Sequence, residues 1–226
     1  LWAMAIGPRA VLALMGWAVV LTPLPSPRAT IAGGLLLAVA FTAKQHVALL
    51  GLPMLVWVWR THGRERAKLF VLSSVVPALC FLLVMTLATG GDFLKWLILV
   101  PAAHGQTLAR LIPGAQIEVW RAMPLTMTAV LLAATWVWKR SYWAMIAGMT
   151  LVIVSIMRGH TGGYVNVLIP MFWVECLLPI VAASALGGAR ARAVAGVVIA
   201  LQLAIWRLDT GRFWGKISAG LPIATA

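Results

Sequence analysis

The sequence predicts an all-α protein: a polytopic transmembrane helical bundle of about eight membrane segments, forming one transmembrane domain over residues 1–226. Hydrophobic residues make up 62% of the chain, charged residues only 10%, and the mean hydropathy is +0.98. A soluble domain carries about 25% charged residues. The charges also fall between apolar runs, as connectors do between membrane segments. We therefore expect an integral, multi-pass membrane protein, located in a bacterial inner (plasma) membrane.

The net charge of +13 raises the alternative of a nucleic-acid-binding protein. The 18 Lys and Arg residues are, however, scattered in ones and twos between apolar runs, without a basic helix face or interleaved aromatic residues. Membrane topology explains such scattered cations better, because connectors on the cytoplasmic side are enriched in them. No nucleic-acid partner is expected.

The central feature is a pair of apolar arms joined by the polar triplet Lys44, Gln45 and His46. A lysine at the middle of a bilayer costs roughly 2.5 to 3.5 kcal/mol on insertion scales, so the triplet is expected at a membrane surface. The arms have 14 and 15 residues and reach about 21 to 23 Å, short of a hydrocarbon core of about 30 Å. We expect two short helices that turn at the triplet and hold its cation where an anionic headgroup can lie.

Prolines, glycines and charges delimit the other segments. The remaining apolar runs cover residues 1–6, 10–21, 69–89, 122–138, 142–157, 165–186 and 193–206. The connector at residues 60–68 holds four cations and one acid, which makes it cytoplasmic by the positive-inside rule. The cations divide evenly between the two sides, so their density in short connectors sets the orientation. An outer loop at about 90–121 and an outer tail at about 207–226 follow.

Three stretches resemble polytopic glycosyltransferases of the GT-C superfamily, which use polyprenyl-phosphate sugars. The stretch LAVAFTAKQHVALLGLPMLVWVW, with the basic turn after it, resembles that family's short paired helices. The stretch MRGHTGGYVNVLIPMFWVECLLP is similar to its polar outer turn before a late helix with proline, and GGDFLKWLILVPAAHG resembles its loop into the outer region. The resemblance covers residues 31–186 and implies that the chain lacks the family's N-terminal part.

The resemblance implies transfer of a hexosyl or pentosyl group from a polyprenyl-phosphate-linked sugar to a glycan or lipid acceptor on the non-cytoplasmic face, among membrane lipids. Such a transfer needs a carboxylate that takes the acceptor's proton and cations that stabilise the departing phosphate. The candidates for binding the donor phosphate are Lys44, His46, Arg158 and His160. The candidates for binding the sugar or acceptor are Gln45, Tyr164 and Asn166.

The catalytic base is left unassigned by the sequence. The family has an essential acid in its first outer loop, whereas no acid precedes Lys44 here, so the base is upstream of Leu1, supplied differently, or lost. Asp92 is the local candidate, with a turn role after two glycines as its alternative. Glu118 is expected to be a solvated acid.

Other interpretations remain open. Lys44 and Arg158 could be interfacial cations that only reach lipid headgroups. The whole chain could be a polytopic transporter or lipid flippase, which also uses broken helices and polar groups at mid-membrane, or a non-catalytic membrane subunit. No cofactor and no metal site are predicted, and a dependence on a divalent metal is left open.

Overall fold

The computed structural model describes residues 13–99, 103, 105–109, 111–112, 115–122, 124–125, 142–159, 170–171, 174 and 188–218. Most of these residues are helical and none forms a β-strand, which confirms the all-α prediction for this part of the chain. A first helix covers residues 13–21. The later elements are α2 (Pro27–Ala43), η1 (Gln45–Leu50), α3 (Gly51–Ala88), α4 (Asp92–Leu94), η2 (Lys95–Leu99), α6 (Ala115–Ala122), α8 (Tyr142–Gly159) and α10 (Ala189–Ser218).

Helix α2 breaks where the sequence predicts. It begins with Pro27, whose fixed φ and missing N–H suit the first turn of a helix. It ends at Ala43, because Lys44 has the extended conformation φ −151°, ψ 108°. The backbone N–H of Lys44 still donates to Ala40 O at 2.9 Å, and the short 3₁₀ helix η1 follows at once. The polar triplet therefore forms a turn between two helical segments.

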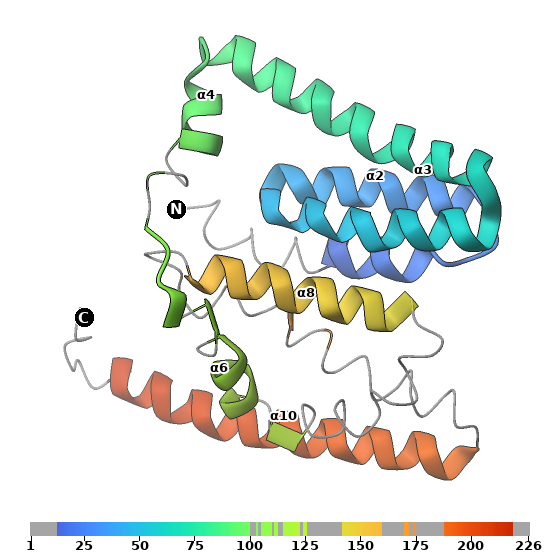
Figure 1. Cartoon of the computed structure of the whole chain (residues 1–226). Coiled ribbons are helices and arrows are strands. Elements are labelled where there is room, and N and C mark those ends of the chain that lie inside the picture. The colour runs from blue at the N-terminus through green and yellow to red at the C-terminus, as the bar shows by residue number, and fades with distance from the viewer. Residues whose placement is uncertain are drawn as a thin grey trace.

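A second sharp turn divides α3 into two arms. Gly63 has φ 83° and ψ 176°, a conformation that is essentially restricted to glycine. The first arm (residues 51–62) runs back along α2, and the second arm (residues 64–88) returns in the opposite direction and diverges from it (Figure 1). The chain from α2 to α3 is therefore a helical hairpin extended by a third rod.

The two turns lie at opposite ends of this unit. His62 Nε2 lies 3.3 Å from Pro23 O, and Arg66 donates to Pro25 O at 3.1 Å. These contacts place the basic turn (residues 60–68) beside the start of α2. Lys44 lies beyond the other end of this helix of 17 residues, which is about 25 Å long.

Two adjacent glycines allow α2 to pack closely on both sides. A Cβ at Gly33 would collide with Thr22 Oγ1 of the turn after the first helix, and a Cβ at Gly34 would collide with Ser73 Oγ of the second arm. The Cβ at Gly34 would also lie only 3.1 Å from Phe70 O. Close approach of helices through small residues is a common mode of packing in membranes.

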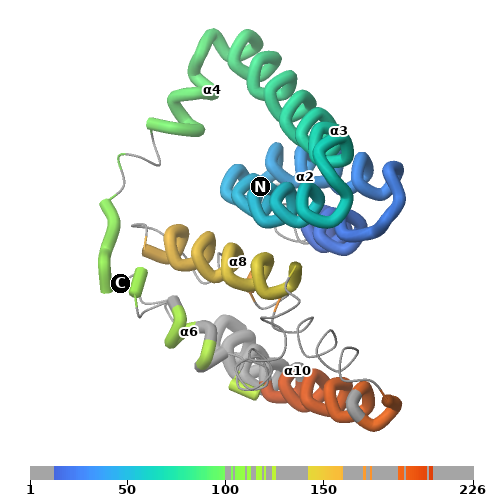
Figure 2. The backbone as a smooth tube through the Cα atoms, turned by 45° about the vertical axis from the view of Figure 1, so that its right-hand side comes forward, coloured from blue at the N-terminus to red at the C-terminus, as the bar shows by residue number. Residues whose placement is uncertain are grey.

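Helix α8 completes the core. Its first residue, Tyr142, is buried and donates a hydrogen bond from its hydroxyl to Val19 O at 2.6 Å. The centroid of the Tyr142 ring also lies 5.4 Å from the centroid of the Trp57 ring on the first arm. Farther along α8, Ile146 and Ile153 join the same buried cluster. The view in Figure 2 shows α8 beside the α2–α3 unit, with α6 and α10 beyond it.

Two described helical stretches are long and apolar enough to cross a membrane: Gln45–Ala88, which includes the Gly63 turn, and Tyr142–Gly159. The second matches the segment expected at residues 142–157. This finding is compatible with a membrane location, whereas the expectation of about eight segments stays a prediction. Most of the segments expected at residues 122–138 and 165–186 lie outside the described residues.

Three stretches differ from the connectors that the sequence predicts. Residues 60–68 are helical on both sides of Gly63, because Arg, Glu, Lys and Ala are good helix formers. The expected outer loop at 90–121 contains α4, η2 and α6. Helix α10 continues past residue 207 to Ser218, since no proline interrupts it.

Candidate functional site

The turn between α2 and η1 presents the cation Lys44. Lys44 and His46 are half-buried, and Gln45 is exposed. Within the described part of the chain, the Lys44 ammonium group makes no hydrogen bond or ion pair. Burial lowers the pKa of Lys44 below the usual value of a lysine, because a low-dielectric surrounding disfavours its charged form. An anion placed here would restore the lost stabilisation of the charge.

An apolar groove of about 320 Å³ begins next to this turn. Its walls come from α2, from η1 with the first arm, and from the second arm. The lining residues are Leu37, Ala38, Phe41, Ala48, Gly51, Leu52, Leu55, Phe70, Val71, Ser74, Val75, Ala78, Leu79 and Leu82. Phe41 and Ala48 are three and four residues from Lys44 in sequence, so one end of this α2–α3 groove lies near the turn, although Lys44 is not among the lining residues.

A second charged group, at the end of α8, is already paired. Arg158 donates two hydrogen bonds to Glu118 of α6, from Nε to Oε2 at 2.6 Å and from Nη2 to Oε1 at 2.7 Å. The side chains are 16% and 34% exposed. The expectation that Glu118 is a solvated acid is therefore wrong, because this bidentate pair satisfies its carboxylate.

Further contacts attach the segment before and within α6 to α8. Gln116 donates from Nε2 to Ser155 Oγ at 2.7 Å, and the backbone N–H of Thr107 donates to Gly159 O at 2.8 Å. The Oε1 atom of Gln116 is buried and finds no hydrogen-bond partner among the described residues. Neither Gln116 nor Ser155 is predicted from the sequence. Glu118 and Arg158 are both expected on the outer side of the membrane. Their shared side is what the sequence offers to predict the ion pair.

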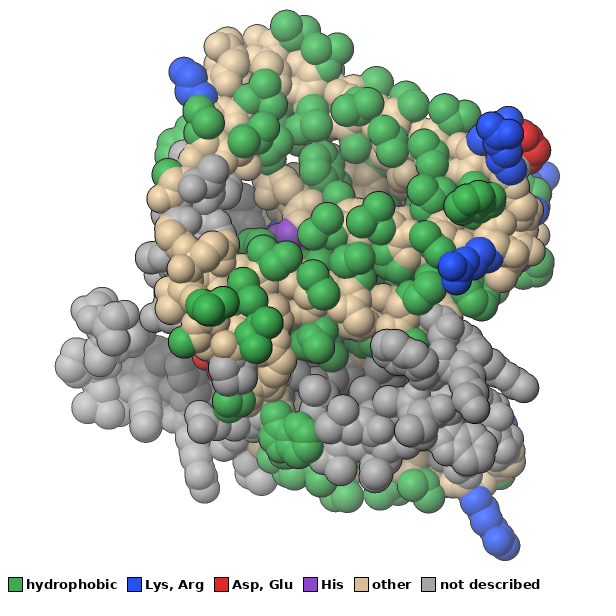
Figure 3. Space-filling model, viewed as in Figure 1, with side chains coloured by type: hydrophobic (Ala, Val, Ile, Leu, Met, Phe, Trp, Pro, Cys, Tyr) green, Lys and Arg blue, Asp and Glu red, His purple; other side chains and the backbone are tan. Residues whose placement is uncertain are grey.

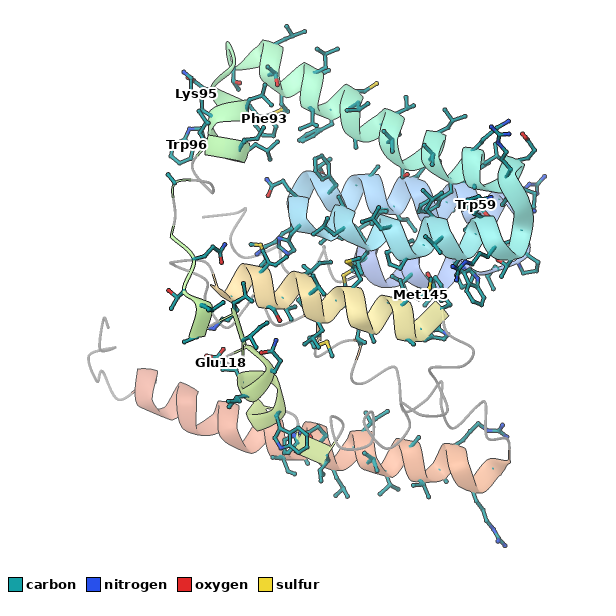
Figure 4. The ribbon with its side chains drawn as sticks, in the orientation of Figure 1. Trp59, Phe93, Lys95, Trp96, Glu118 and Met145 are labelled. Carbon is teal, nitrogen blue, oxygen red and sulfur yellow. The ribbon has the colours of Figure 1, made fainter. Side chains whose placement is uncertain are left out.

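The candidate residues occupy one end of the molecule. The turn after α2 and the last turn of α8 lie at the same end in both ribbon views (Figures 1 and 2). Figure 4 shows Glu118 beside this end of α8 and Trp59 at the opposite end of the α2–α3 unit. The predicted candidates His160, Tyr164 and Asn166 lie outside the described residues.

Asp92 begins α4, directly after Gly90 and Gly91, whose φ values are 58° and 92°. Its carboxylate pairs with Lys95 at 2.7 Å, and both side chains are about two-thirds exposed. An exposed pair of this kind holds its partners weakly, so the carboxylate is still accessible. Gly90 and Gly91 form the turn. Asp92 therefore remains a candidate for the catalytic base.

This end of the molecule combines the cation of the Lys44 turn with a nearby apolar groove. In the described ranges, no group of three or more His, Cys, Asp or Glu side chains is arranged to hold a metal ion. Comparison of the chain with protein-family models, curated proteins and solved structures finds no match.

Proposed function

We propose that the chain is a multi-pass protein of a bacterial inner membrane and acts there as a glycosyltransferase. It would transfer a sugar from a polyprenyl-phosphate donor to a glycan or lipid acceptor on the non-cytoplasmic face. The observation that supports this function is the half-buried Lys44, which makes no hydrogen bond or ion pair with the described residues and whose sequence neighbours Phe41 and Ala48 line an apolar groove of about 320 Å³. A polyprenyl phosphate has the matching parts, an anionic head and a long hydrocarbon tail.

The surface of the second arm supports a lipid surrounding. Leu79, Leu83 and Leu87 follow one another at helical spacing and are 57%, 60% and 73% exposed. A contiguous exposed apolar face of this kind is unusual on a soluble monomer, where it would favour aggregation. Lipid would cover it.

In the proposed reaction, the bond between the anomeric carbon and the phosphate oxygen breaks, and the acceptor hydroxyl oxygen forms the new bond to that carbon. The acceptor's proton goes to a carboxylate, for which Asp92 is the local candidate, and the electron pair of the broken bond stays on the phosphate. Lys44 stabilises the phosphate as its charge grows. Arg158 has its charge engaged by Glu118, so in this scheme it holds the outer segment against α8.

Binding of polyprenyl phosphate to the protein in lipid nanodiscs tests the proposal. A charge-assisted hydrogen bond contributes about 1.5 to 3 kcal/mol, so Lys44→Ala should weaken binding by roughly 10- to 100-fold. Lys44→Arg should retain most of the affinity. The control is Lys95→Ala, which removes an equal charge from the exposed pair with Asp92 and should bind like the wild type.

Equal affinities for Lys44→Ala and the wild type would remove Lys44 from the mechanism. The catalytic step needs its own measurement: release of free polyprenyl phosphate from a radiolabelled donor, with the label appearing in the acceptor. Movement of an unchanged lipid between leaflets, without sugar transfer, would instead favour a transporter or flippase.

A further inference from the structure

A second groove lies at the opposite end of the α2–α3 unit, between the two arms of α3. It has a volume of about 450 Å³. The first arm contributes Leu55 and Trp59, which are four residues apart and so share a helix face. The second arm contributes Ala67, Val71 and Leu72 to the wall, together with two cations. This interarm groove shares only Leu55 and Val71 with the α2–α3 groove.

The two cations lie at one end of the interarm groove. Arg64 is the first residue after the Gly63 turn, Lys68 follows one helical turn later, and Leu72 follows one turn after that. These three residues form a single row along the second arm. The row is about 12 Å long and changes from charged to apolar with distance from the turn. Lys and Arg side chains gather at this end of the molecule, next to the apolar surface of the α3 arms (Figure 3).

The charges in this row are available. Arg64 is exposed and makes no hydrogen bond or ion pair among the residues the structure describes. Lys68 pairs with Glu65 at 2.7 Å, but the two side chains are 53% and 81% exposed, and such a pair is worth little. Arg66, in contrast, is held by Pro25 O and Thr30 Oγ1. The turn thus separates a structural cation from two whose aliphatic stems line the groove.

Trp59 forms the other edge of the groove. Its side chain is 62% exposed, and Figure 4 shows it near the turn of α3. Exposed tryptophans prefer the layer between lipid headgroups and hydrocarbon. A ring in that layer next to two cations suits a ligand with a charged head and an apolar tail.

From this charge complementarity we infer that the interarm groove binds an anionic phospholipid of the cytoplasmic leaflet. Its phosphate contacts Arg64 and Lys68, and an acyl chain lies along Leu55, Val71 and Leu72. Basic pockets between membrane helices on the cytoplasmic side recognise anionic headgroups in this way. The inference relies on the membrane location in the proposed function, and it does not depend on sugar transfer or on Lys44.

The test titrates the purified full chain, in a neutral detergent, with phosphatidylglycerol and with phosphatidylcholine of equal chain length, and counts bound lipids by native mass spectrometry. Phosphatidylglycerol should bind more tightly. Arg64→Gln and Lys68→Gln should each weaken its binding by about fivefold, the effect of one cation at a lipid surface. Leu72→Asn, which leaves both cations in place, should weaken the binding of the acyl chain as well.

The matched control is Arg60→Gln. Arg60 is exposed in the same basic turn but does not line the groove, so this variant removes the same net charge and should bind like the wild type. An equal loss in Arg60→Gln would overturn the inference, since it would indicate only the general charge of the turn. Equal binding of the two lipids, or displacement by inorganic phosphate, which cannot occupy the apolar part, would also overturn it. A failure of the polyprenyl phosphate experiment with Lys44 would leave these outcomes unchanged.

Discussion

Replacement of Gly63 by alanine should destabilise the protein through backbone conformation alone. With φ 83° and ψ 176°, Gly63 occupies a region that costs other residues about 1 to 3 kcal/mol. No atom lies within 4 Å of the position that a Cβ would occupy, so a steric collision adds nothing to this cost. Gly63→Ala should therefore lower the free energy of unfolding by about 1 to 3 kcal/mol.

Gly148→Ala is the matched control, because Gly148 also has open space around its Cβ position but lies within helix α8. There alanine is the better helix former and should raise the free energy of unfolding by about 0.5 to 1 kcal/mol. Reversible unfolding in mixed micelles, followed by circular dichroism, measures both changes. If Gly63→Ala were as stable as the wild type, or gained stability as Gly148→Ala should, the left-handed turn would not exist in the folded protein.

Three further predictions follow from the packing and the charges. Gly34→Ala should destabilise the fold by about 1 to 3 kcal/mol, since its Cβ would press on Ser73 and on backbone; the same unfolding assay measures this, and an unchanged midpoint would contradict the close packing of α2. Glu118→Gln should cost about 1 to 2 kcal/mol, less than the loss of a fully buried pair because Glu118 is 34% exposed; retained stability would show that the pair is dispensable. Because burial lowers the pKa of Lys44, its charge is lost at a lower pH than that of an exposed lysine. Affinity for polyprenyl phosphate should accordingly begin to fall at a pH below the usual pKa of a lysine, about 10.4, while Lys44→Arg, charged throughout, should show a flat profile; parallel profiles for the two proteins would contradict the assignment.

The turn at Lys44 could be predicted because local physics decides it. A lysine between two short apolar arms is expensive within hydrocarbon, and α2 ends at the residue before it. The sequence signal and the structural boundary coincide there.

The Gly63 turn and the Arg158–Glu118 pair could not be derived in the same way. A reversal within residues 60–68 is expected from the basic connector, but its concentration at Gly63 alone is not, because the residues on both sides favour a helix. The ion pair joins residues 40 positions apart, and their proximity depends on how α6 is held against α8. Long-range pairing of this kind follows from the tertiary fold, which the order of apolar runs does not specify.

The continuity of the α2–α3 unit also bears on how the protein is made. Its three rods follow one another within residues 27–88, and their close contacts through Gly34 and Arg66 span fewer than 50 residues of chain. Such local contacts form quickly, and the N-terminal part of a chain emerges first during synthesis. We expect this unit to assemble during translation, before the ribosome has completed α8, and to serve as the template on which the later helices dock.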